Sequence, residues 1–89
     1  MCTMIAQQLK VNGSGKSGAN WTHINLASVS YDHPYHMPLE YSLNLDFTNQ
    51  AGERVAVELD ADSARKLVET VQEVIRLAEM GGFILHASS

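Results

Sequence analysis

Cysteine, proline and basic residues are all scarce in this 89-residue chain, and two of these shortages exclude whole classes of protein. Cys2 is the one cysteine, so no disulfide can form within the chain, which fits a reducing cytoplasm. Lys and Arg number 6 against 10 Asp and Glu, so no basic face for nucleic acid is expected. No apolar run approaches the ~18 residues of a membrane span, and the first residues lack the basic start and apolar core of a signal peptide. We therefore expect a soluble cytoplasmic protein with no nucleic-acid or membrane partner.

The length predicts one domain, residues 1–89, near the lower size limit for a single hydrophobic core. A hydrophobic share of 45% and a charged share of 18% are typical of a globular domain and not of a disordered chain. A chain this short buries only about 60% of its extended surface, so association with a partner is an expected source of stability. We therefore predict self-association, as a homodimer.

Four segments have the composition of β-strands: residues 4–11, 21–31, 40–48 and 53–59. The third is the most regular, because apolar and polar residues alternate along its whole length, as in a strand with one buried face. One face of it carries Tyr41, Leu43, Leu45 and Phe47, and the other carries Glu40, Ser42, Asn44, Asp46 and Thr48.

Two connections in the first half are less regular. Residues 12–20 are rich in Gly, Ser and Asn, so they are expected to form a hairpin loop. In the next strand, Ile24 and Val29 can share a buried face only if the strand shifts phase, so a bulge is expected near Ala27 and Ser28.

From Asp60 the periodicity becomes helical, and a helix is predicted over residues 61–80, capped by Asp60 or Asp62 and ended by Gly81 and Gly82. An apolar tail, residues 83–85, follows. The fold class expected is α+β, a four-stranded antiparallel β-meander followed by one C-terminal α-helix packed on one sheet face. One helix covers only part of such a face. The apolar stripe of the helix consists of Ala64, Leu67, Val68, Val71, Val74, Ile75 and Ala78.

Nucleotide binding is not expected, although the first loop contains Gly15-Lys16-Ser17, which matches the end of a phosphate-binding loop. The first glycine of that motif would fall at Lys10, and a strand follows where the motif requires a helix. The segment is better interpreted as part of a flexible hairpin.

A metal site is one hypothesis for the connection before the third strand. His33 and His36 are two residues apart in a segment stiffened by Pro34 and Pro38, and imidazole is a common metal ligand. Cys2 or Glu40 could complete a shell suited to a divalent metal such as zinc. The alternative is an ordinary turn, because a lone pair of histidines lacks the second ligand pair of a specific zinc motif.

Acid–base catalysis on a small organic molecule is a second hypothesis. Asp46 or Glu58 would be the general base and His33 or His36 the acid, since both carboxylates lie on the polar face of neighbouring strands. The alternative is a solvated polar face, which antiparallel sheets usually have. The hypothesis of catalysis requires an apolar pocket, which would be lined by Trp21, Tyr31, Tyr35 and Met37.

The motifs of the chain resemble those of a family of small bacterial proteins of unknown function. They are MCT at the start, GSGK in the first loop, DHPxHxPxE-x-x-LNxDF in the middle and RVAVEL-x-x-x-SAR before the helix. The resemblance extends over about residues 1–67 and implies no activity, because the family has none assigned. It implies that relatives have a histidine at the position of Tyr41. This chain therefore lacks the third histidine that a three-histidine site would need.

The function expected from the sequence is therefore a small homodimeric binding domain, with a metal or small-ligand site in the 33–40 connection. The alternatives are the small enzyme described above and a structural or regulatory interaction module that docks through the tail at residues 83–85.

Overall fold

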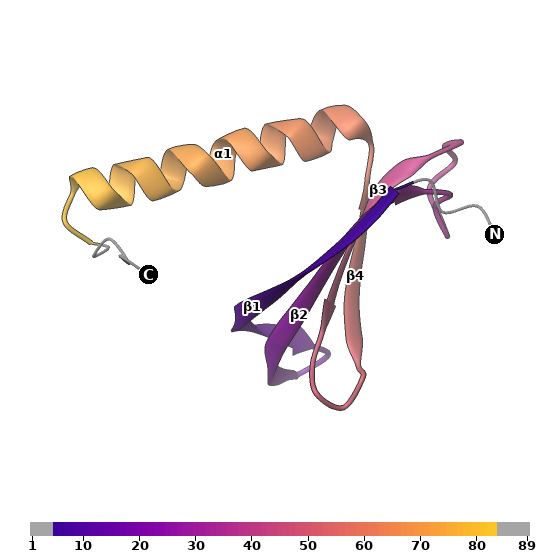
Figure 1. Cartoon of the computed structure of the whole chain (residues 1–89), viewed down its shortest axis with the longest axis horizontal. Helices are drawn as coiled ribbons and strands as arrows, with labels where there is room; N and C mark the ends of the chain where they lie inside the picture. Colours follow the sequence, from indigo (N-terminus) through magenta and orange to yellow (C-terminus); the bar gives the residue numbers. More distant parts are fainter. Residues whose placement is uncertain (1–4, 84–89) are drawn as a thin grey trace.

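The structure is a computed structural model that describes residues 5–83. Its sheet has four antiparallel strands in the order β1-β2-β3-β4, and a single helix follows the last strand (Figure 1). This confirms the α+β meander with one C-terminal helix that the periodicity predicts. The elements are β1 (Ile5–Ser17), β2 (Asn20–Asp32), β3 (Ser42–Thr48), β4 (Arg54–Leu59) and α1 (Ala61–Met80).

The first hairpin is longer than the sequence suggests. Residues 12–17, expected in a loop, continue β1 and pair with β2 up to Ser17 opposite Asn20. The turn has only two residues, Gly18 and Ala19, and Gly18 has a φ of 63°. A glycine with positive φ at the first central position is the arrangement of a type II′ hairpin turn. The backbone groups of these glycines and serines therefore pair with β2. The turn propensity of their side chains does not decide where β1 ends.

The bulge expected near Ala27 lies in β1 instead. The register shifts between Lys10 and Gly13, where β1 has one residue more than the facing part of β2. From Leu26 to Asp32, β2 pairs with β3 without interruption. Ile24 and Ala27, three positions apart, are the two buried hydrophobic residues among those described. The bulge predicted within β2 near Ala27 and Ser28 is therefore wrong, and the irregularity in this hairpin lies in β1.

The β3–β4 connection is organised by Asn49, whose side chain is buried. Its Nδ2 donates to Thr22 Oγ1 at 3.0 Å and to Glu53 Oε1 at 2.9 Å, which ties the turn to β2. Its Oδ1 accepts from the backbone N–H groups of Ala51 and Glu53. Every polar atom of this buried amide is therefore satisfied, as buried polar groups require.

Helix α1 begins and ends at the predicted signals. Asp60 is the N-cap, and its Oδ1 accepts from the backbone N–H of Ser63 at 2.7 Å. The hydrogen bond favours the ionised carboxylate and lowers the pKa of Asp60. At the other end Gly82 takes a φ of 76°, so the left-handed residue that closes the helix is Gly82.

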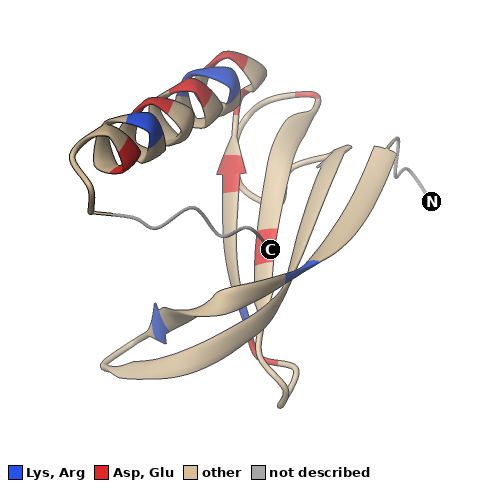
Figure 2. Cartoon of the chain, turned by 60° about the vertical axis from the view of Figure 1, so that its left-hand side comes forward, with Lys and Arg blue, Asp and Glu red and all other residues tan. Residues whose placement is uncertain are grey.

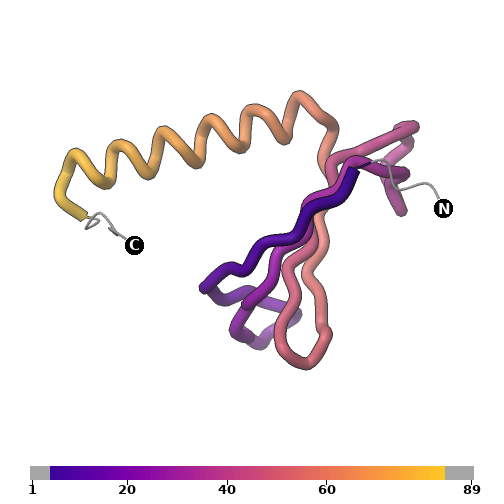
Figure 3. The backbone as a smooth tube through the Cα atoms, in the orientation of Figure 1, coloured from indigo at the N-terminus to yellow at the C-terminus, as the bar shows by residue number. Residues whose placement is uncertain are grey.

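The helix meets the sheet at β3 and projects away from it over most of its length (Figures 1 and 3). None of its residues is buried. The apolar stripe was expected to cover Leu43, Leu45 and Phe47, yet Val71 in its centre is 48% exposed and Val74 is 58% exposed. The three sheet residues are themselves only half-buried. Within the described residues, no helix has the length and apolarity to cross a membrane.

Candidate functional site

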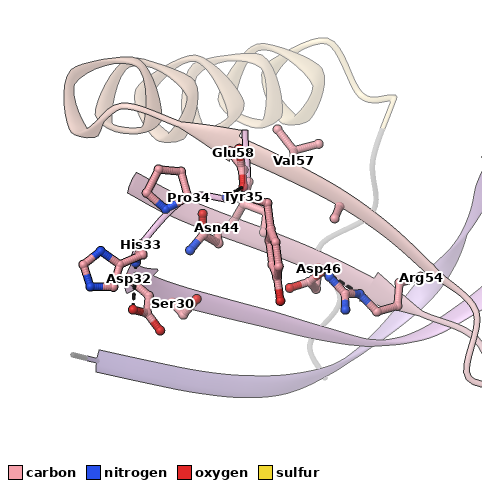
Figure 4. Close-up of a pocket in the computed structure, with 12 residues that line it drawn as sticks. Ser30, Asp32, His33, Pro34, Tyr35, Asn44, Asp46, Arg54, Val57 and Glu58 are labelled. Atoms are coloured by element: carbon pink, nitrogen blue, oxygen red, sulfur yellow. Dashed lines mark hydrogen bonds and ion pairs between the residues drawn. The ribbon is translucent and has the colours of Figure 1, made fainter. Parts of the chain in front are cut away.

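A polar hollow of about 400 Å³ lies on the face of the sheet that carries the alternating polar residues (Figure 4). Its floor comes from the end of β2, the middle of β3 and most of β4, and its wall is the start of the 33–41 connection. This connection folds back over the sheet, so residues far apart in sequence line one space. The lining residues are Ser30, Asp32, His33, Pro34, Tyr35, Asn44, Leu45, Asp46, Arg54, Ala56, Val57 and Glu58.

The connection is held in place by Glu58 of β4. Its Oε2 accepts a hydrogen bond from the backbone N–H of Tyr35. Its Oε1 accepts from the N–H groups of His36 at 3.1 Å and Met37 at 3.3 Å. One carboxylate therefore binds three consecutive backbone donors and fixes this part of the loop to β4.

These bonds change the chemistry of Glu58. The N–H of Tyr35 is the largest cause that lowers the pKa of the carboxyl, and the N–H groups of Met37 and His36 and the charge of His36 add to it, against a smaller opposing effect of desolvation. A general base works best with a pKa near the working pH, so a carboxylate with a lowered pKa is a weak one. Glu58 is therefore suited to holding the loop and poorly suited to the base role that the sequence suggested for it.

Asp46, the other candidate base, is paired with Arg54. Its Oδ1 accepts from Arg54 Nε at 3.0 Å and lies 2.9 Å from Arg54 Nη2. The register places Asp46 opposite Ala56 and Glu58 opposite Asn44, so the two carboxylates are not direct cross-strand neighbours. The charge of Asp46 is therefore paired with that of Arg54 on β4.

His33 is oriented by its own surroundings. Its ring stacks on Tyr41 with centroids 4.9 Å apart, and Tyr41 stacks in turn on Tyr31 at 5.6 Å. Its Nδ1 lies 3.0 Å from the backbone oxygen of Glu40. A carbonyl oxygen only accepts, so Nδ1 carries a proton, and in the neutral ring Nε2 presents a lone pair. The backbone N–H of His33 donates to Asp32 Oδ1 at 2.7 Å, which completes the turn out of β2.

The predicted metal ligands are only partly brought together. His33, His36 and Glu40 all lie in the one connection and are exposed. Glu40 was expected on the third strand, but β3 begins at Ser42, and Glu40 contributes its backbone oxygen to His33. Cys2 lies outside the described residues. Across residues 5–83, no group of three or more His, Cys, Asp or Glu side chains is placed to hold a metal ion.

Of the four residues expected to line an apolar pocket, Tyr35 alone lines the polar hollow. Trp21 is at the far end of β2 and is 67% exposed, and Tyr31 belongs to the ring stack. The sequence reasoning missed Ser30 and Asp32 as lining residues. Their alternation with Val29 and Tyr31 could have placed them on the polar face of β2.

The model of a family of unknown function (DUF6295) matches residues 1–83. No curated protein and no solved structure matches the chain.

Proposed function

The chain belongs to the family of unknown function DUF6295, and we propose that it is a small homodimeric cytoplasmic domain that binds a small amino- or hydroxyl-bearing molecule in the polar hollow. The observation that carries this proposal is the clamp of Glu58 on three backbone N–H groups. A loop held in one shape lowers the entropy lost when a ligand binds beneath it.

The charge of the lining indicates the class of ligand. Three carboxylates face this hollow, those of Asp32, Asp46 and Glu58, against the single guanidinium of Arg54. Both contacts of Arg54 are made to Asp46 Oδ1, so Oδ2 of that carboxylate is available to accept from a ligand. The net negative charge of these side chains favours a ligand that carries positive charge or donates hydrogen bonds.

Tyr35 supports the same class of ligand. Figure 4 shows its side chain reaching from the loop along the hollow, between Asn44 and Asp46. The residue is 92% exposed, so its ring is accessible to a ligand in the hollow. An aromatic face beside carboxylates attracts an ammonium group through cation–π interaction.

We expect putrescine to bind in the hollow and succinate, of equal carbon number and opposite charge, not to bind. In amide NMR titrations, the signals of Ser30, Asn44 and Asp46 should shift saturably with putrescine alone. The variant Tyr35→Leu should weaken this response at least about fivefold through loss of the cation–π contribution. Trp21→Leu, an exposed aromatic at the far end of β2, is the matched control and should bind as the natural chain does. Equal responses to both compounds would contradict the proposal.

A metal at the same loop is a second candidate, favoured by the state of His33. A ring whose Nδ1 donates to a backbone carbonyl has its Nε2 set for a metal, as in many natural sites. We expect zinc, if bound by His33 and His36 with Cys2 or Glu40, to remain near one equivalent in protein purified without an affinity tag. It should raise the melting temperature, and His33→Gln should abolish both effects. Less than about a tenth of an equivalent, with no change in melting on adding zinc, would exclude this candidate.

A further inference from the structure

We propose that α1 of each protomer packs on the apolar sheet face of a second copy, so that the dimer forms by reciprocal exchange of helices. The apolar sheet face consists of the residues that alternate with the polar ones. It carries Ile5 and Leu9 of β1, Val29 and Tyr31 of β2, Leu43, Leu45 and Phe47 of β3, and Val55, Val57 and Leu59 of β4.

The connection between β4 and α1 is unusually short, and the helix contacts its own sheet at β3 without covering the rest of it. Leu59 ends the strand and Ala61 begins the helix, so only Asp60 lies between them. Connections between a strand and a helix packed on the same sheet usually need 2–6 residues. Asp60 is also bound to the N–H of Ser63 as the N-cap, which fixes the direction in which the helix leaves the strand.

The exposed surface is larger than one folded chain of this size has. Monomeric proteins of 9.8 kDa expose about 5,200 Å², whereas this chain exposes 7007 Å², roughly 1,800 Å² more. Its radius of gyration is 15.0 Å, against about 12 Å for a compact chain of this length. A specific interface removes about 800 Å² from each partner, so the excess is enough for a stable dimer.

The two uncovered surfaces match each other. On α1, Leu67, Val71 and Ile75 are 45%, 48% and 45% exposed and follow one another at helical spacing. On the sheet, Ile5 is 61% exposed and Leu9 is 51% exposed. The helix is about 30 Å long, and β3 and β4, with 7 and 6 residues, are about 20–23 Å long, so a helix laid along the partner's β3 and β4 reaches from end to end of them. Because every chain carries both surfaces, a dimer with a two-fold axis buries the helix stripe and the sheet face of both chains.

The charges of α1 favour a second copy over a lipid surface. The helix carries four carboxylates and three cations, interleaved along its length (Figure 2). Helices that lie on anionic membranes carry an excess of Lys and Arg on the polar face, which this one lacks. The polar face instead makes its own ion pairs, Arg65 with Asp62 and Arg76 with Glu73.

This inference rests on the homodimer of the proposed function and is independent of its ligand. Inserting six residues, three Gly-Ser repeats, between Leu59 and Asp60 would give α1 the freedom to fold back on its own sheet. We expect the natural chain to be a dimer by analytical ultracentrifugation. The insertion should raise its dissociation constant at least about tenfold and leave its helix content by circular dichroism unchanged.

The matched control places the same six residues between Gly18 and Ala19, in the exposed turn of the first hairpin, where α1 is unaffected. This variant should dimerise as the natural chain does. If the natural chain is dimeric and the insertion before Asp60 does not change its dissociation constant, helix exchange is overturned but the proposal of a homodimer is not. A natural chain that is monomeric, including one that binds anionic vesicles, overturns both.

Crosslinking between two different chains tests the same point if the insertion variant does not fold. In a Cys2→Ser background, which has no other thiol, Val71→Cys is introduced in one chain and Val57→Cys in the other. The two are mixed, unfolded and refolded together, and treated with a bismaleimide. Helix exchange predicts a covalent dimer that contains one chain of each kind. A covalent dimer of Val71→Cys chains alone would show helix-on-helix pairing instead and would overturn the proposal.

Discussion

Val71→Glu is expected to convert the dimer to monomers. Val71 is in the middle of the stripe on α1, and its position in the dimer would be enclosed by apolar residues of the partner's sheet. A carboxylate there must be desolvated without a partner charge, and the exchange places two of them in each dimer. We expect the dissociation constant to rise about 100-fold or more, measured by sedimentation equilibrium. The monomer should also melt at a lower temperature than the natural dimer, because its sheet loses its cover.

Met80→Glu is the matched control for this substitution. Met80 is apolar, belongs to the same helix, and is 72% exposed, but it lies on the opposite side from Val71. The Met80→Glu substitution therefore adds the same charge to the helix and removes apolar surface, but it places no charge in the proposed interface. Equal dissociation constants for Val71→Glu and Met80→Glu would contradict helix exchange, whether both variants remain dimeric or both become monomeric.

Glu58→Gln is expected to release the loop over the polar hollow. A neutral amide oxygen accepts more weakly than a carboxylate, and only one of its two terminal atoms can accept at all. Three backbone N–H groups, those of Tyr35, His36 and Met37, then compete for one acceptor. We expect their hydrogen-exchange protection factors to fall at least about tenfold and the putrescine response to weaken with them.

The same loop should respond to pH in a defined direction. The pKa of Glu58 in the folded chain lies below its ordinary value of 4.5, chiefly because the N–H of Tyr35 binds the ionised form. Its contribution to stability is therefore complete above pH 4.5 and is lost as the pH falls through the folded pKa. Protection of the three amides should fall over this range in the natural chain, and in Glu58→Gln it should already be low at neutral pH.

Glu69→Gln is the control for both experiments, since Glu69 is an exposed glutamate on α1, far in sequence from the loop. Its loop amides should keep their natural protection. Unchanged protection of the three amides in Glu58→Gln would show that the loop keeps its shape without the carboxylate, and the binding proposal would lose its main support.

The parts of the fold that depend on local periodicity could be predicted. Alternation along β3, from Leu43 to Phe47, identifies a strand with one buried face, and the spacing of Leu67, Val71 and Ile75 identifies the helix. The N-cap at Asp60 follows from its position before that stripe. In each case the signal lies within a few residues of the structure it predicts.

The parts that depend on pairing between distant segments could not be predicted. The glycines of residues 12–17 extend β1 because β2 offers them backbone partners, whatever their own preference for turns. Glu58 has the pattern of an ordinary outward residue on β4, and its role exists only because a loop more than 20 residues earlier folds over it. The stripe of α1 indicates burial, but a stripe does not specify whether the covering surface belongs to the same chain.

The mass of the natural chain in solution tests the central claim most directly. A sheet and a helix whose apolar faces are both uncovered need a second copy, so sedimentation equilibrium at tens of micromolar should give twice the 9.8 kDa of one chain. A mass of 9.8 kDa under the same conditions, with a melting temperature that does not change with protein concentration, would contradict the account.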